Sequence, residues 1–131
     1  MTQTLEQKRA RDALDKVRKI ERACQGEQQE KFVSYVESLP ATILTNGLGQ
    51  AAAMLLAQAK GEQRDAHRML YEALKDWLCR DDPHAPYRGQ ADLMVAIVNQ
   101  DRATYLRAQA EALAWVEWLK RFAVAFLKKK D

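Results

Sequence analysis

The chain has little of what enzymes and small secreted proteins are usually built from. Its 131 residues include two histidines, two cysteines, five glycines and three prolines. So few glycines and prolines leave little material for turns, which argues against a fold of many short strands and favours a few long helices. Cys24 and Cys79 show no paired spacing, and we interpret them as partly buried thiols in a reducing compartment.

Long apolar runs are also missing. No stretch approaches 18 uninterrupted apolar residues, and the first residues, MTQTLEQKRARD, contain no apolar run. We therefore expect no membrane span, no secretory signal and a cytoplasmic location. With 47% apolar residues, a chain of this length is expected to form a single domain, 1–131, that buries a core without a disulfide or a metal.

Motifs of catalysis and cofactor binding are missing as well. Gly47-Leu48-Gly49 has no preceding strand and no following Lys-Ser/Thr, so it is not a phosphate-binding loop. His67 sits among charged neighbours, where a solvated or hydrogen-bonded histidine is expected rather than a catalytic one. We expect no enzyme activity, no cofactor and no metal. The donors around residue 80 follow no recurrent ligand spacing: Cys79, Asp81, Asp82 and His84.

Apolar residues recur at helical spacing through most of the chain. The pattern predicts an all-α fold, a compact bundle of about six helices with long first and last members, the last being the longest. A capping box at Thr4 and Gln7 should open the first helix, Gly26 should end it, and Asp101 should cap the last one. The stretch RDDPHAPYRGQ is predicted to be a rigid surface connector. The expected helices span 3–25, 27–46, 48–60, 62–79, 90–99 and 102–127.

A corner is predicted in the stretch LPATILTNGLGQAAAMLLAQAK, residues 39–60. Pro40 is expected to break or kink the second helix, with Ser38 as a cap for the restart. Asn46-Gly47 should then end that helix, because both residues tolerate a left-handed backbone. The alanine-rich helix that follows allows a neighbouring helix to approach closely.

The net charge is only +3, and it is distributed unevenly. Residues 1–26 and 101–131 each carry seven Lys/Arg against four Asp/Glu, whereas 27–100 carries seven against ten. A basic excess at both ends permits contact with nucleic acid. One outward strip of the first helix, about 21 Å long, is either a phosphate-tracking surface or an ordinary solvated face. Its basic residues, interrupted by Asp15, are Lys8, Arg11, Arg18 and Arg22.

The last predicted helix is apolar on two sides. Leu106 and Leu113, with Lys120, project away from the main apolar stripe, so this helix either crosses the middle of the bundle or meets a partner. The short helix 90–99 is apolar nearly all round and is likewise expected to be buried or to face a partner.

Two classes of function remain: a subunit that contacts nucleic acid, and a protein–protein scaffold whose charge serves solubility. The stripe expected to face the core is Tyr105, Ala108, Ala112, Trp115, Leu119, Phe122 and Phe126.

Two stretches of the chain carry a family signature. Pro40, Ile43 and the run from Asn46 to Gln50 follow the pattern P-x-x-I-x-x-N-G-L-G-Q. The second stretch comprises Tyr105, Ala108, Glu111, Ala112, Leu113, Trp115, Trp118, Leu119, Lys120, Arg121, Phe122 and Ala123. Together they resemble the small, all-helical subunit of the type III-B CRISPR effector, the fifth subunit of the Cmr complex.

The resemblance implies a non-catalytic subunit that stacks in several copies as a filament within an RNA-guided antiviral complex. Its implied partners are the other Cmr subunits, copies of itself, and the guide and target RNA. It transfers no RNA-binding residues, so these are predicted from charge. Phosphate neutralisation without base readout is expected, since sequence recognition is left to base pairing. The three tryptophans and most phenylalanines lie at core spacing and are not expected to stack on bases. The strip of the first helix ranks first for RNA contact, and the second-rank candidates are Lys16, Lys19, Lys120 and Arg121.

Overall fold

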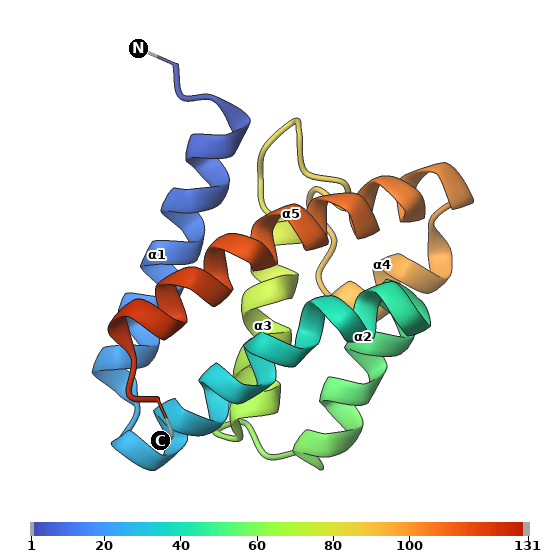
Figure 1. Cartoon of the computed structure of the whole chain (residues 1–131). Coiled ribbons are helices and arrows are strands. Elements are labelled where there is room, and N and C mark those ends of the chain that lie inside the picture. The colour runs from blue at the N-terminus through green and yellow to red at the C-terminus, as the bar shows by residue number, and fades with distance from the viewer. Residues whose placement is uncertain (1, 130–131) are drawn as a thin grey trace.

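The computed structural model describes residues 2–129, and within that range it contains five α-helices and no strand (Figure 1). The all-α prediction is confirmed. The expected helices 27–46 and 48–60 are two halves of one element, so the count is five rather than six. At 34 residues this element, and not the last helix with 25, is the longest. The helices are α1 (Leu5–Ala23), α2 (Gly26–Ala59), α3 (Ala66–Leu78), α4 (Leu93–Asn99) and α5 (Arg102–Phe126).

The second helix, α2, bends at one glycine. Gly47 has φ 86° and ψ 159°, far from helical values, and Figure 1 shows the two arms of α2 meeting there in a sharp bend. The predicted corner at Asn46-Gly47 is therefore confirmed. The predicted break at Pro40 is wrong, because its buried ring lies inside a continuous first arm. Ser38 does not cap a restart either, since its hydroxyl donates to the carbonyl of Tyr35 at 3.2 Å.

The last helix, α5, joins the two sides of the bundle. It packs against both α1 and α2, and α2 in turn packs against α3. Figure 1 shows α5 running diagonally across the molecule, in front of α1 and α3. Burying a large apolar side chain contributes about 1.5–3 kcal/mol, so the fold rests mainly on this core. Its largest fully buried members are Phe32, Ile43, Leu48, Leu70, Tyr71, Leu74, Trp77, Leu78, Tyr87, Leu93, Trp115 and Leu119.

The predicted caps at the helix starts are confirmed. Thr4 and Gln7 exchange two backbone–side-chain hydrogen bonds of 2.8 and 3.0 Å, which form the capping box of α1. Asp101 accepts a hydrogen bond from the backbone N–H of Thr104 at 2.9 Å and so caps α5. Each cap satisfies backbone donors that a helix start leaves without a partner.

The end of α1 differs from the prediction. The helix stops at Ala23 because Cys24 and Gln25 adopt extended backbone, and Gly26 begins α2 instead of closing α1. Two residues in extended conformation therefore end α1, and a glycine in the left-handed conformation does not.

By length and composition alone, α2 is apolar enough to cross a membrane. Its apolar side chains, however, supply much of the bundle core, and the helix bends at Gly47. We therefore interpret α2 as the core helix of the bundle.

Candidate nucleic-acid interface

The basic strip of α1 points away from the core. Ala13, Val17 and Ile20 bury the opposite face of the helix. At 100° per residue, Arg11 and Arg22 lie near the outermost line of α1, and both residues are exposed. The strip therefore faces solvent, as its spacing predicted.

Lys8, at the start of the strip, is tied to the connector between α3 and α4. Its Nζ lies 3.3 Å from Oδ2 of Asp82. The backbone N–H of His84 donates to Asp82 at 2.7 Å, and this hydrogen bond, helped by Lys8, lowers the pKa of the Asp82 carboxyl. Asp82 therefore stays ionised at neutral pH and offsets the charge of Lys8, which leaves Lys8 a weaker phosphate ligand than the strip alone implied.

Arg18 makes two side-chain contacts, an ion pair and a stacking contact on an aromatic ring. Its guanidinium pairs with Glu21 at 3.0 Å, and its Cζ lies 4.0 Å from the ring centroid of Phe126, at the end of α5. Stacking of a guanidinium on an aromatic face is favourable and holds its plane in place. Arg18 thus joins α1 to the end of α5 while part of its side chain remains exposed.

The second-rank candidates also differ in availability. Lys16 lies 2.9 Å from Oδ1 of Asp12 and is mostly buried, so little of it can reach a ligand. Lys120 lies 3.6 Å from Glu117 on the same helix. Four exposed candidates have no carboxylate within 4.0 Å among residues 2–129, and they are Arg11, Lys19, Arg22 and Arg121.

A buried polar cluster, here called the Arg9–Glu111 clasp, holds α1 against α5. Nε and Nη2 of Arg9 donate to the two carboxylate oxygens of Glu111 at 2.7 and 2.9 Å. Nε1 of Trp77 donates to the same carboxylate at 3.1 Å, and Glu111 is only 9% exposed. The hydrogen bonds to Glu111 raise the pKa of Arg9. Sequence reasoning missed this clasp, because its partners lie 102 positions apart and no local pattern links them.

The two leucines predicted to meet a partner occupy different environments. Leu106 is 50% exposed, whereas Leu113 is partly buried and packs on the core. The short helix α4 is not buried all round either, since Leu93 is buried but Val98 is 72% exposed. Exposed apolar side chains therefore occur on α4 and near the start of α5.

The thiol of Cys79 is partly buried, and the imidazole of His67 is hydrogen-bonded to the residue that caps α3. Among residues 2–129, no group of three or more His, Cys, Asp or Glu is placed to hold a metal ion. Burial raises the pKa of the Cys79 thiol to about 11, so it is a neutral thiol at pH 7. Nδ1 of His67 lies 2.8 Å from Asp65, the residue that caps α3, which confirms a hydrogen-bonded histidine.

Fold and surface together define a small, all-helical protein whose first helix carries exposed cations on its outer face. The chain belongs to the family of the CRISPR-associated protein Cas_Cmr5, whose model matches residues 5–126. It is 32% identical over 120 residues to the CRISPR system Cmr subunit Cmr5 of Thermus thermophilus, across 92% of this chain and 93% of that protein.

A solved structure agrees with this assignment. The crystal structure of a CRISPR-associated Cmr5 family protein, also from Thermus thermophilus, matches with a TM-score of 0.72 and 30% sequence identity. The match covers 95% of this chain and 99% of that one. The family indicated by the two sequence stretches is thereby confirmed.

Proposed function

We propose that this chain is a non-catalytic small subunit of a type III-B CRISPR (Cmr) RNA-guided complex, acting in antiviral defence in the cytoplasm. Several copies stack as a filament among the other Cmr subunits and contact RNA through its phosphate backbone. Family membership supports the place in the complex. The RNA contact is supported by one observation above all: the outward face of α1 carries Arg11, Lys19 and Arg22 without carboxylate partners among residues 2–129.

Phosphate contact suits these residues better than base readout does. A guanidinium presents a planar fork of donors that fits two phosphate oxygens. Phosphates carry no sequence information, so a subunit that uses them accepts any target while base pairing selects it. A net charge of +3 gives one copy little affinity, and stacked copies raise the effective concentration of the others.

Removing two strip charges should weaken binding of every target equally. In the assembled complex, log affinity falls as log salt rises, and Arg11→Gln with Arg22→Gln is expected to reduce the magnitude of this negative slope by about 2, about 1 for each phosphate that is no longer neutralised. The fold-change should be the same for two targets of unrelated sequence. Titration of labelled target RNA at several salt concentrations measures both quantities.

Two other exposed cations provide the matched control. Lys31 on α2 pairs with Glu27 at 3.6 Å, and Arg88 in the connector after α3 pairs with Asp81 at 2.9 Å, so both lie outside the strip and each has a carboxylate partner. Changing these two cations to glutamine removes the same net charge but should leave the salt slope unchanged. A normally assembled complex whose affinity and salt slope survive the loss of Arg11 and Arg22 would exclude the strip and leave the chain as a protein scaffold.

An exposed leucine tests the contact with a neighbouring subunit. Leu106→Glu is expected to reduce incorporation of this subunit into the complex about 30-fold, the loss typical of one interface anchor, while its helical circular dichroism stays unchanged. Leu44→Glu is the control, because Leu44 is equally apolar and 71% exposed but lies on α2. Leu113→Glu is less informative, since Leu113 packs on the core and its loss would destabilise the isolated subunit. Normal incorporation of the Leu106 variant would remove this residue from the interface.

A further inference from the structure

Gln29, near the start of α2, connects three segments of the chain. Its Nε2 donates to the backbone carbonyl of Glu21 at 3.2 Å and to that of Cys24 at 3.0 Å. Its Oε1 accepts a hydrogen bond from the backbone N–H of Lys128 at 2.9 Å. One side-chain amide therefore joins the end of α1, the start of α2 and the segment that follows α5.

The end of α1 is where this helix needs such a partner. The carbonyl groups in the last turn of a helix have no intrahelical donor, and α1 stops because Cys24 and Gln25 are extended. The N–H of Cys24 bonds to the carbonyl of Ile20 at 3.0 Å, and the next carbonyl, that of Glu21, accepts from Gln29. Gln29 therefore closes the last turn of α1 from outside that helix.

Residues 127–129, here called the C-terminal strap, hold Gln29 from the other side. Leu127 is only 6% exposed and belongs to the core, so its burial fixes the path of the strap. Lys129 pairs with Glu37 on α2 at 3.4 Å. Figure 1 shows the chain leaving the end of α5 and passing beside the start of α2. The amide of Gln29 is therefore held between its own helix and the strap.

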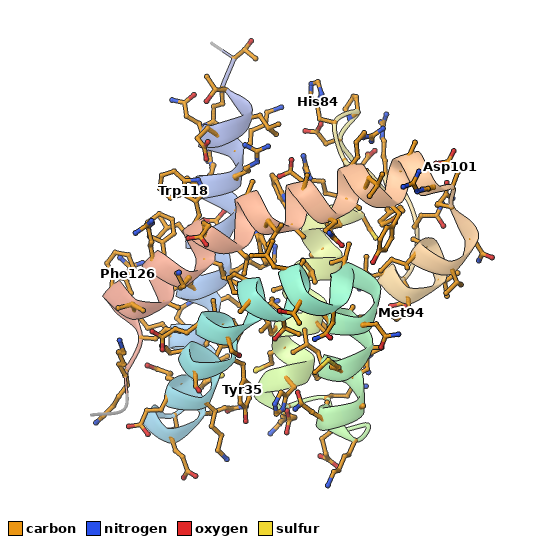
Figure 2. The ribbon with its side chains drawn as sticks, turned by 45° about the vertical axis from the view of Figure 1, so that its right-hand side comes forward. Tyr35, His84, Met94, Asp101, Trp118 and Phe126 are labelled. Carbon is orange, nitrogen blue, oxygen red and sulfur yellow. The ribbon has the colours of Figure 1, made fainter. Side chains whose placement is uncertain are left out.

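The strap begins where α5 meets α1. Figure 2 shows Phe126 at the end of α5, on the side where this helix crosses α1. Cζ of Arg18 lies 4.0 Å from the ring centroid of Phe126, and the N–H of Leu127 still bonds to the carbonyl of Ala123 at 3.0 Å. The chain around the strap is thus tied to α1 at Arg18 and again, through Gln29, about one turn later.

Arg22 belongs to the turn that Gln29 closes. It lies between Glu21 and Cys24 in the last turn of α1, and the residue is exposed. Helix ends fray most readily, and a cation on a frayed turn must be ordered before it can bind, which weakens binding. Holding this turn in place lowers that ordering cost when Arg22 meets a phosphate.

We propose that Gln29 is a positioning residue of the basic strip: held by the C-terminal strap, it keeps Arg22 in the orientation that meets a phosphate. Arg11 lies about three turns earlier on α1 and does not depend on this contact. The inference rests on the proposed phosphate contact of the strip and names the contacts within the chain that support it.

Hydrogen exchange followed by NMR in the full chain tests the closed turn. Gln29→Leu is expected to accelerate exchange of the Cys24 amide about tenfold, as the loss of two hydrogen bonds implies. The amide of Val17, in the buried middle of α1, should accelerate much less. Equal acceleration of both amides would mean that Gln29 contributes only to global stability, and would overturn the proposal. Gln50→Leu is the control, because Gln50 is an exposed glutamine on the second arm of α2, and it should change neither rate.

A proline in the strap tests whether the strap acts through Gln29. Lys128→Pro removes the backbone N–H that Gln29 accepts, and it suits the extended backbone of Leu127, at φ −99° and ψ 159°. It is expected to accelerate exchange of the Cys24 amide about threefold, as the loss of one hydrogen bond implies. Lys128→Ala removes the same charge but keeps the N–H, so it should leave the rate unchanged. Equal rates in the two variants would overturn the role of the strap.

RNA binding in the assembled complex tests whether Gln29 acts through Arg22. Gln29→Leu is expected to reduce the magnitude of the negative salt slope by up to about 1, the share of one phosphate. It should have no further effect in a chain that already carries Arg22→Gln, but its full effect in one that carries Arg11→Gln, because coupled residues are non-additive and independent ones are additive. Equal effects in both backgrounds would refute the positioning role.

The two proposals fail in different ways. If Arg22→Gln reduces the magnitude of the salt slope but Gln29→Leu does not, the phosphate contact stands and the positioning role is refuted. If Arg22→Gln leaves affinity and slope unchanged, the phosphate contact of Arg22 is refuted, and faster exchange at Cys24 then reports a strap that only closes the end of α1. Circular dichroism of each variant verifies that it is folded before binding is compared.

Discussion

Replacing Gly47 with valine is expected to lower the free energy of unfolding by about 3–5 kcal/mol, a large part of the 5–15 kcal/mol typical of a whole domain. The backbone of Gly47, at φ 86° and ψ 159°, lies in a region that essentially only glycine occupies. A Cβ atom at this position would also lie 3.1 Å from the hydroxyl oxygen of Tyr105. Strain and crowding therefore act at the same residue.

Tyr105 cannot move away from an added Cβ without loss, because it caps the second arm of α2. Its hydroxyl accepts a hydrogen bond from the backbone N–H of Gly49 at 2.9 Å. Oε1 of Gln109 accepts one from the N–H of Leu48, also at 2.9 Å. Two side chains of α5 thus satisfy donors that the bend leaves open, as an N-cap does at a helix start. Displacing Tyr105 would open one of these bonds.

Two other glycines separate the causes. Gly49→Ala should be neutral or stabilise by up to about 1 kcal/mol, because Gly49 is helical and its added Cβ would meet neighbours at an ordinary 3.5 Å. Gly61→Ala should lose about 1–2 kcal/mol from its φ of 79° alone, since nothing lies within 4 Å of its Cβ. Urea unfolding followed by circular dichroism ranks the three. If Gly47→Val is no more harmful than Gly61→Ala, the contact with Tyr105 contributes nothing.

The bend at Gly47 also shows which features of the fold can be predicted from neighbouring residues in the sequence. Gly47 was predictable because its effect is local: few residues adopt a positive φ, and asparagine and glycine signal one. Pro40 was misjudged because a proline in a helix costs about 3 kcal/mol locally, but its ring is buried and neighbours such as Leu39 and Ile43 are buried as well. Packing of the whole arm outweighs the local preference, and no window around Pro40 contains that information.

The basic strip likewise combines a feature that local sequence predicts with features that depend on distant residues. Helical spacing was enough to place Arg11 and Arg22 on the outside. It could not tell that Lys8 is neutralised by Asp82, 74 positions away, or that Arg18 rests on Phe126. The exposure of Phe126 was missed for a similar reason, because core spacing along α5 does not reveal which parts of the helix the neighbouring elements leave uncovered.

Glu111→Ala is expected to lower the free energy of unfolding by about 3 kcal/mol. The change leaves the guanidinium of Arg9 and the N–H of the buried Trp77 without their acceptor, and an unmade buried hydrogen bond costs more than a formed one contributes. Because the clasp joins α1 to α5, the basic strip should also lose its fixed orientation. Urea unfolding of the isolated chain gives the stability, and the salt slope of RNA binding in the complex reports on the strip.

A surface pair on the same helix is the control for the clasp. Glu117→Ala removes the 3.6 Å partner of Lys120 at a site where Glu117 is 46% exposed, so its expected loss is below about 1 kcal/mol. Replacing both charges of the clasp, Arg9→Met with Glu111→Leu, should be far less harmful than Glu111→Ala alone, since no charged partner is then left buried. The difference between the double variant and the sum of its single variants measures the coupling. Additive losses would mean that Arg9 and Glu111 stabilise the bundle independently, and that α1 is held by its apolar face alone.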